Sequence, residues 1–260
     1  MMEKGMNHRG QTTIFIIIAV LIIVTGIAIF LARQTETSTG ISNILSKLNV
    51  KTEASQVQSS ILDCVELTAQ DALTIVGIQG GYYNKPENFF DLGWTYIPYY
   101  YDQGTFAMPS SETIEKELAF YVDDSLHFCV EELDYDEFEI SFKESKTSSR
   151  IEENEVSFKT NLEISFETAE LSSDFSLAHP VKIESALSDI LEVASYITDS
   201  HKEDKDMICI SCVADLAAEK NLYVDMLDFG EETTTLVVIS ENYTSSEPYV
   251  FEFLNRYPEL

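Results

Sequence analysis

The pattern of hydrophobic positions sets the N-terminus apart from the rest of the chain. Ile14 to Ala32 is a run of 19 residues without a charge. As a helix rising about 1.5 Å per residue, it would span roughly 28 Å, close to the roughly 30 Å hydrocarbon core of a bilayer. A cleavable secretory signal has a shorter apolar run, of about 7–15 residues, followed by small residues, whereas this run ends near Phe30. The pattern predicts an uncleaved transmembrane helix within residues 11–33 rather than a buried core helix.

The charges beside this run predict its orientation. Lys4 and Arg9 precede it, and Arg33 is the one basic residue that directly follows it. The positive-inside rule then keeps residues 1–10 in the cytoplasm as a short leader and places residues 34–260 outside the cell.

Helical periodicity returns after a polar stretch at residues 34–52, which reads as a tether. From Glu53 to Val76 apolar residues recur every three or four positions, and the glycines of Gly77–Gly81 end the pattern. Serines after Pro109 offer caps for a second helix, whose apolar positions run from Ile114 to Leu133. Residues 53–134 are therefore expected to be mainly helical.

The second half of the chain alternates between apolar and polar residues. Residues 138–142 and 156–166 have a period of two, which is typical of strands with one buried face in an antiparallel sheet. Helical spacing returns at 183–197 and again, briefly, at 211–220, and three closing strands follow. Helices and strands are grouped rather than alternating, so the expected class is α+β, with the sheet in region 135–260.

The charge balance narrows the range of partners. The chain has 16 basic and 45 acidic residues, a net charge of −29. Residues 1–33 carry three basic residues and one acidic residue, so the predicted exterior part carries −31. Such a surface repels nucleic acid and anionic lipid headgroups. Solubility is the favoured explanation, with a high-salt milieu or a cationic partner as alternatives.

Four cysteines, Cys64, Cys129, Cys209 and Cys212, suggest disulfides outside the cell. Cys64 and Cys129 each lie on the apolar face of a predicted helix, so packing of the two helices favours a bridge between them. Two buried free thiols are the alternative. Cys209 and Cys212 form a CxxC motif, for which a structural disulfide is favoured over a redox site or a zinc site. Sequence leaves the pairing open.

An aromatic loop at residues 82–109 is the remaining candidate for binding. Trp94, Tyr99, Tyr100 and Tyr101 offer rigid contact area with polar tips, which suits recognition of protein or sugar. The alternative is that these rings pack back on the two helices as a small core.

Motifs for catalysis are largely missing. The chain has no nucleophile elbow, phosphate loop, dinucleotide fingerprint or zinc-protease motif. No catalytic residue, metal ligand or cofactor is therefore predicted, and a thiol–disulfide enzyme using Cys209 and Cys212 is the only enzyme class with a sequence hint. Asn242 begins an N-glycosylation sequon, which is compatible with an exterior location.

The N-terminal residues resemble the processing site of archaeal type IV pilins and pilin-like proteins, a class III signal. In that family a basic leader ends in Lys/Arg-Gly, a prepilin peptidase cuts after the glycine, and the apolar segment becomes the helix of the filament core. Arg9-Gly10 matches the leader end, Gln11 the mature first residue, and residues 12–31 the apolar stem. Phe15 stands where bacterial pilins have Glu, and the predicted exterior part is large for a major pilin. That exterior part resembles archaeal envelope proteins with the same N-terminus.

The resemblance implies an anchored, pilin-like surface protein that acts in attachment or in envelope or filament structure without catalysis. Its implied partners are the membrane, crossed once, a prepilin peptidase, and copies of itself or other pilin-like subunits. The alternative is a signal-anchored binding module that recognises protein or glycan through the aromatic loop.

Overall fold

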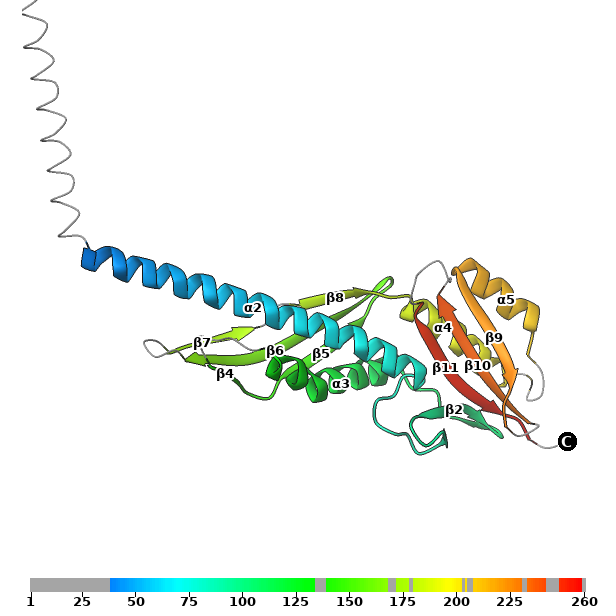
Figure 1. Cartoon of the computed structure of the whole chain (residues 1–260). Helices are drawn as coiled ribbons and strands as arrows, with labels where there is room; N and C mark the ends of the chain where they lie inside the picture. The colour runs from blue at the N-terminus through cyan, green and yellow to red at the C-terminus, as the bar shows by residue number, and fades with distance from the viewer. Residues whose placement is uncertain are drawn as a thin grey trace, which may run out of the picture. The chain divides into compact units, whose positions relative to one another are not determined.

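A computed structural model describes residues 38–133, 139–167, 172–177, 180–202, 204, 208–230, 233–241 and 248–258. The chain divides into two compact units, residues 1–57 and 58–260. In the first unit all described residues, 38–57, belong to helix α2 (Ser38–Ile78). The second unit contains the rest of α2 and every other described element (Figure 1).

The predicted fold class included a transmembrane helix, and the structure corrects this part of the prediction. Within the residues that the structure describes, no helix is both long enough and apolar enough to cross a membrane. The longest helix, α2, carries Asp63, Glu66 and Asp71, and residues 11–33 of the predicted transmembrane helix lie outside the described residues. The described part is α+β, with four helices and two sheets.

Helix α2 begins at Ser38, within the segment expected to be a tether, rather than at Glu53. Its last turns bury one face, and the helix ends where Gly80 and Gly81 adopt positive φ angles of 57° and 85°. The amide of Gly81 donates to the carbonyl of Val76 at 2.7 Å, which satisfies one of the terminal carbonyl groups of the helix.

Helix α3 (Ser111–Glu131) begins where the serine pair after Pro109 predicts a cap. Ser110 has an extended backbone, and its hydroxyl accepts a hydrogen bond from the amide of Thr113. The buried face of α3 follows the helical period and lies against β5 (Lys146–Ile151).

One antiparallel sheet is built around the long strand β6 (Glu155–Glu167). Val156, Phe158, Thr160, Leu162 and Ile164 are all buried, as the alternating pattern predicts. The other strands of this sheet each pair with β6, two along each half: β4 (Glu139–Phe142), β5, β7 (Ser172–Leu177) and β8 (Pro180–Glu184).

The second sheet joins the aromatic segment to the C-terminal strands. Its strands run in the order β1-β2-β11-β10-β9, with the short β3 on β2. All neighbours are antiparallel except β2 and β11, which are parallel. The bounds are β1 (Phe89–Asp91), β2 (Tyr96–Asp102), β3 (Thr105–Phe106), β9 (Leu222–Asp228), β10 (Thr234–Glu241) and β11 (Val250–Arg256).

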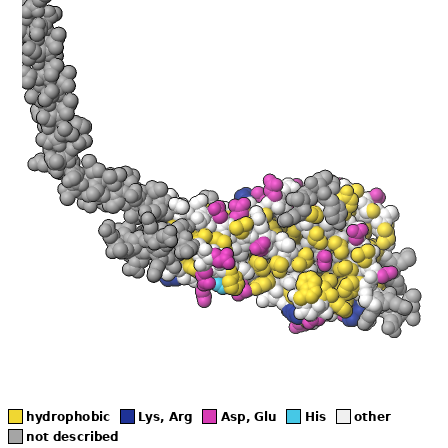
Figure 2. Space-filling view, in the orientation of Figure 1, with side chains coloured by type: hydrophobic (Ala, Val, Ile, Leu, Met, Phe, Trp, Pro, Cys, Tyr) yellow, Lys and Arg dark blue, Asp and Glu magenta, His cyan; other side chains and the backbone are white. Residues whose placement is uncertain are grey.

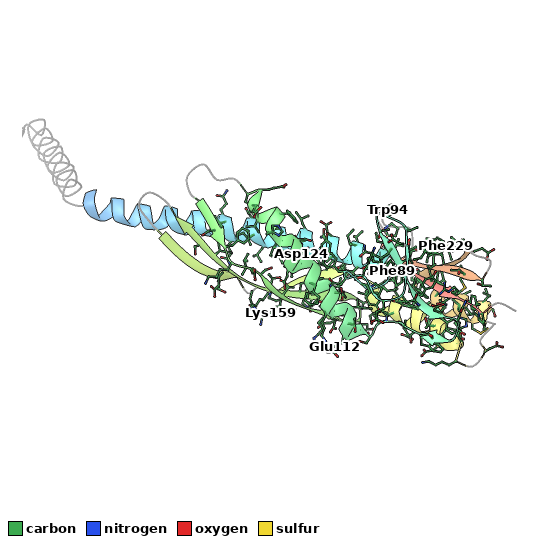
Figure 3. The ribbon with its side chains drawn as sticks, turned by 90° about the horizontal axis from the view of Figure 1, so that it is seen from below. Phe89, Trp94, Glu112, Asp124, Lys159 and Phe229 are labelled. Atoms are coloured by element: carbon green, nitrogen blue, oxygen red, sulfur yellow. A yellow bond between two sulfur atoms is a disulfide. The ribbon has the colours of Figure 1, made fainter. Side chains whose placement is uncertain are left out.

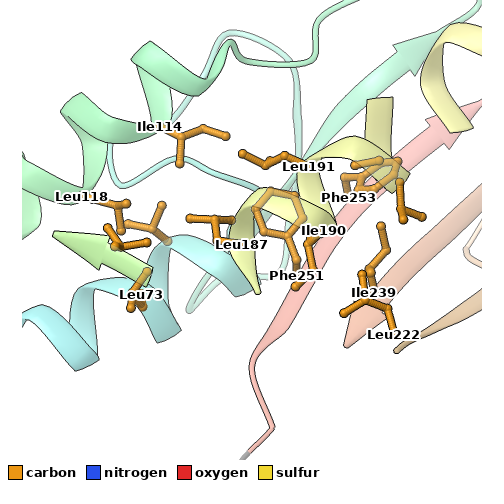
Figure 4. Close-up of a cluster of buried hydrophobic side chains, with 14 of the residues drawn as sticks. Leu73, Ile114, Leu118, Leu187, Ile190, Leu191, Leu222, Ile239, Phe251 and Phe253 are labelled. Carbon is orange, nitrogen blue, oxygen red and sulfur yellow. The ribbon is translucent and has the colours of Figure 1, made fainter. Parts of the chain in front are cut away.

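Helices α4 (Leu187–Ser200) and α5 (Ile210–Glu219) pack on one face of this second sheet. One continuous core joins these helices to α2, α3 and both sheets, and Figure 4 shows Phe251 beside Leu187 and Ile190. The opposite face carries a smaller apolar cluster, which holds Tyr99 and Leu254. Figure 2 shows apolar side chains gathered over β9, β10 and β11 on this opposite face.

Candidate functional site

The aromatic segment forms strand β2 rather than an open loop. Tyr99 is 6% exposed, and Tyr100 and Tyr101 are fully buried. The Tyr100 ring stacks on Phe253 at 4.3 Å between centroids, and its hydroxyl donates to the carbonyl of Gly80 at 2.9 Å. Burial raises the pKa of the Tyr100 hydroxyl well above its ordinary value. Tyr99, Tyr100 and Tyr101, three of the four residues proposed for binding, are therefore packed inside the protein, as the alternative interpretation predicted.

Trp94 is the exposed exception. It lies in the turn between β1 and β2, which is fixed by a hydrogen bond from the Gly93 amide to the Asp91 carboxylate. The Trp94 side chain is 83% exposed, and Figure 3 shows it projecting on the side of Phe89 and Phe229.

The first disulfide joins Cys64 on α2 to Cys129 on α3, with a Cα–Cα distance of 5.7 Å. This is the pairing that the two apolar helix faces predict. Cys64 is 2% exposed and Cys129 is half-buried, so the bridge is partly shielded from solvent. It closes a 65-residue separation and braces the two helices, which is a structural role.

The second disulfide joins Cys209 and Cys212, three residues apart, at the start of α5. Cys209 is the N-cap residue, and its sulfur accepts a hydrogen bond from the Cys212 amide at 3.3 Å. The Ser211 hydroxyl lies 3.6 Å from the same sulfur. All four residues of the motif are exposed, Ile210 at 63%. This bridge therefore lies in solvent with two hydrogen-bond donors directed at one of its sulfurs.

Two grooves flank α5. One, of about 620 Å³, is apolar and runs between α5 and β9, with Ile210 at its edge. The other, of about 890 Å³, lies between α4, α5 and residues 106–111. Its lining includes Cys212 and Leu216 from α5 and hydroxyl groups from α4. Cys212 thus lines the second groove, whereas Cys209 lines neither groove.

A buried polar cluster at the end of α4 has no signal in the sequence. His201 is 1% exposed and stacks on Tyr101 at 4.5 Å between ring centroids. Its Nε2 atom lies 3.4 Å from both the Asn255 side-chain nitrogen and the Tyr257 hydroxyl. Burial lowers the pKa of His201, against a smaller opposing effect from Asp204. The cluster holds the neutral imidazole between β2 and β11.

The remaining predicted positions fall outside these features. Gly10, Gln11 and the sequon residue Asn242 lie outside the described residues. Among the residues that the structure describes, no group of three or more His, Cys, Asp or Glu side chains is placed to hold a metal ion.

Comparisons with known proteins give no relative for this arrangement. No protein-family model matches the chain, and no curated protein or solved structure matches it. The interpretation of function therefore rests on the residues themselves.

Proposed function

We propose that this protein is a pilin-like surface protein, cut after Gly10 and held by its apolar N-terminal segment, that displays an α+β unit outside the cell for attachment or filament structure. The observation that carries the proposal is the sequence Arg9-Gly10-Gln11 directly before an uncharged apolar run. The proposal assigns the protein no catalysis. Its partners would be a prepilin peptidase and either copies of itself or other pilin-like subunits.

Two structural features support this proposal. The 41-residue helix α2 follows the apolar segment closely in the chain and leads into the second unit, as expected where an N-terminal stem carries a globular head. Two disulfides fit an oxidising exterior, because cytosolic thiols are usually kept reduced.

The intact mass of the protein from its own membranes tests the proposal. We expect a chain that begins at Gln11. A Gly10→Leu variant should keep residues 1–10, whereas the matched variant Gly5→Leu, which changes another leader glycine, should still be cut. A wild-type chain that keeps its leader in every membrane fraction would contradict the proposal.

Exposure of Trp94 favours a second candidate function, a binding module whose contact residue is this tryptophan. Trp94 is the only tryptophan, so its fluorescence reports any ligand that covers it. Titration with a panel of oligosaccharides should shift or protect this emission if a glycan binds at the β1–β2 turn. A ligand that binds without any change in the emission, or with unaltered affinity for Trp94→Ala, would argue against this contact.

A further inference from the structure

The two disulfides of this protein differ in what they do for the fold. The Cys64–Cys129 bridge joins two helices across a 65-residue separation, with Cys64 buried and Cys129 half-buried. The Cys209–Cys212 bridge spans three residues within one helix start, so it removes little conformational freedom from the unfolded chain. Because this bridge lies in solvent and stabilises the fold little, stability alone does not explain why the protein has it.

The surroundings of Cys209 and Cys212 make the two sulfurs chemically unequal. Cys209 Sγ accepts from the Cys212 amide, and the Ser211 hydroxyl, 3.6 Å away, is the donor in that pair because a disulfide sulfur carries no hydrogen. Both donors, and the partial positive charge at the N-terminus of the ten-residue helix α5, stabilise negative charge on Cys209. Cys209 is therefore the better leaving group of the two.

The other sulfur is the one that a reactant can approach. Cys212 lines the groove of about 890 Å³ between α4, α5 and residues 106–111. Tyr196 and Phe106, 40% and 41% exposed, stand in the lining of the same groove and offer apolar contact to an incoming chain. A reactant in this groove therefore meets Cys212, whereas Cys209 lines neither groove.

From this arrangement we infer that Cys209–Cys212 is a thiol–disulfide exchange site, at which an external thiol attacks Cys212 and Cys209 departs as the thiolate. The attacking thiolate forms a mixed disulfide with Cys212 Sγ, and the electron pair of the broken bond stays on Cys209 Sγ. A second external thiolate then attacks the external sulfur of the mixed disulfide and releases Cys212. The external thiols become a disulfide, and the two cysteines hold the two electrons and take up two protons from water.

Selective reduction of the full-length protein tests the site. We treat it with increasing dithiothreitol under native conditions, quench with acid, alkylate, and map the modified cysteines by mass spectrometry. Cys209 and Cys212 should be reduced at concentrations that leave Cys64–Cys129 oxidised. If both bridges open together, or only on unfolding, the inference is overturned.

A separate experiment tests which of the two sulfurs the external thiol attacks. Brief exposure to reduced glutathione, followed by acid quench and alkylation, should place glutathione on Cys212 and the alkyl group on Cys209. Glutathione mainly on Cys209 would overturn the assignment. A cysteine-containing peptide serves as the second probe. A faster reaction with the peptide than with glutathione would identify a protein chain as the preferred reactant, because the peptide can also contact the groove.

Ser211 provides a matched pair of variants that keep both cysteines. Ser211→Ala removes one donor to the leaving sulfur, so the glutathione reaction should slow by about three- to tenfold. Ser59→Ala changes an exposed serine on α2 that lines neither groove, and it should react at the wild-type rate. Equal rates for the wild type and Ser211→Ala would remove the role given to the hydroxyl.

Discussion

Arg256 and Asp102 form a two-bonded ion pair between residues that are 154 positions apart in the chain. Nε and one terminal nitrogen of the guanidinium donate to the two carboxylate oxygens at 2.7 and 2.8 Å. The Asp102 carboxylate also accepts from Asn88 at 2.7 Å. The pair closes the ends of the parallel strands β2 and β11, and both side chains are largely shielded from solvent.

Replacement of Arg256 by Gln should lower the free energy of unfolding by about 2 kcal/mol, because a charged, doubly bonded acceptor loses its partner. Lys116→Gln is the control, since its pair with Glu112 is exposed and worth about 0–0.5 kcal/mol. Urea unfolding measures both.

The Arg256 bond is the main cause that lowers the pKa of Asp102. The stabilisation is therefore present above the usual carboxyl pKa and is lost as the pH falls below about 4. A variant that unfolds like the wild type at neutral pH would contradict this assignment.

The two disulfides should contribute unequally to stability. Cys64→Ala with Cys129→Ala should cost about 3–4 kcal/mol, as expected for a bridge that closes a loop of 65 residues. Cys209→Ser with Cys212→Ser should cost less than half of that, since serine keeps a capping oxygen at the start of α5. Thermal unfolding in the absence of reductant compares the two variants. Equal losses would mean that the short bridge is structural.

Gly80 should tolerate no side chain, for a reason that goes beyond its backbone angle. At φ +57° a Cβ would stand 2.6 Å from the Glu252 carbonyl oxygen and 2.5 Å from Pro98. Gly230 has a similar φ of +64° but open space around it. Gly230→Ala should cost about 1–2 kcal/mol, the usual penalty for the left-handed region. Gly80→Ala should cost clearly more, and equal losses in chemical unfolding would show that the turn after α2 packs less closely against Pro98 and Glu252.

Substitutions at Tyr100 and Trp94 should differ in their effect on stability, because Tyr100 is buried and Trp94 is exposed. Tyr100→Ala should cost about 3–5 kcal/mol, because a large, fully buried ring leaves a cavity. Tyr100→Phe removes only the bond to Gly80 and should cost about 1 kcal/mol. Trp94→Ala should stay within about 0.5 kcal/mol of the wild type. In the wild type, acrylamide should quench the single tryptophan almost as readily as free tryptophan, and strong protection would contradict its exposure.

His201 should make the fold sensitive to mild acid. Its pKa is lowered by burial, so the unfolded chain binds a proton at a higher pH than the folded chain does. The favourable contribution is present above the usual histidine value of 6.5 and is lost as the pH falls below it. The stability of the wild type minus that of His201→Gln should therefore decrease from pH 7 to pH 5. His127→Gln, on α3, serves as the control, and a difference that does not change with pH would contradict the prediction.

Local periodicity predicted the elements that have one buried face. The alternation at residues 156–166 gave strand β6, and the spacing around Cys64 and Cys129 gave both the helices and their bridge. Strand β2 was missed because six of its seven residues are buried, so the segment has neither a two-residue period nor a polar face. Its aromatic composition and Pro98 made it resemble a loop.

The features that join distant segments were beyond reach of the sequence. Nothing near Asp102 points to Arg256, because that relation depends on the parallel pairing of β2 and β11. Nothing near His201 points to Asn255, because that relation depends on the packing of the end of α4 against β11. The CxxC motif was visible, but the inequality of its sulfurs depends on the cap geometry of α5 and on a groove assembled from three segments.

The parallel pairing of β2 with β11 also determines when the second sheet can form during synthesis of the chain. The tyrosines of β2 are made long before their neighbour, because residues 250–256 must be synthesised before the sheet can close. Until then a run of aromatic residues with an open strand edge is a hazard for aggregation, and the slow search for a distant partner extends that period. A chain released or cleaved before residue 250 should therefore be lost to aggregation or proteolysis rather than accumulate as a shortened form.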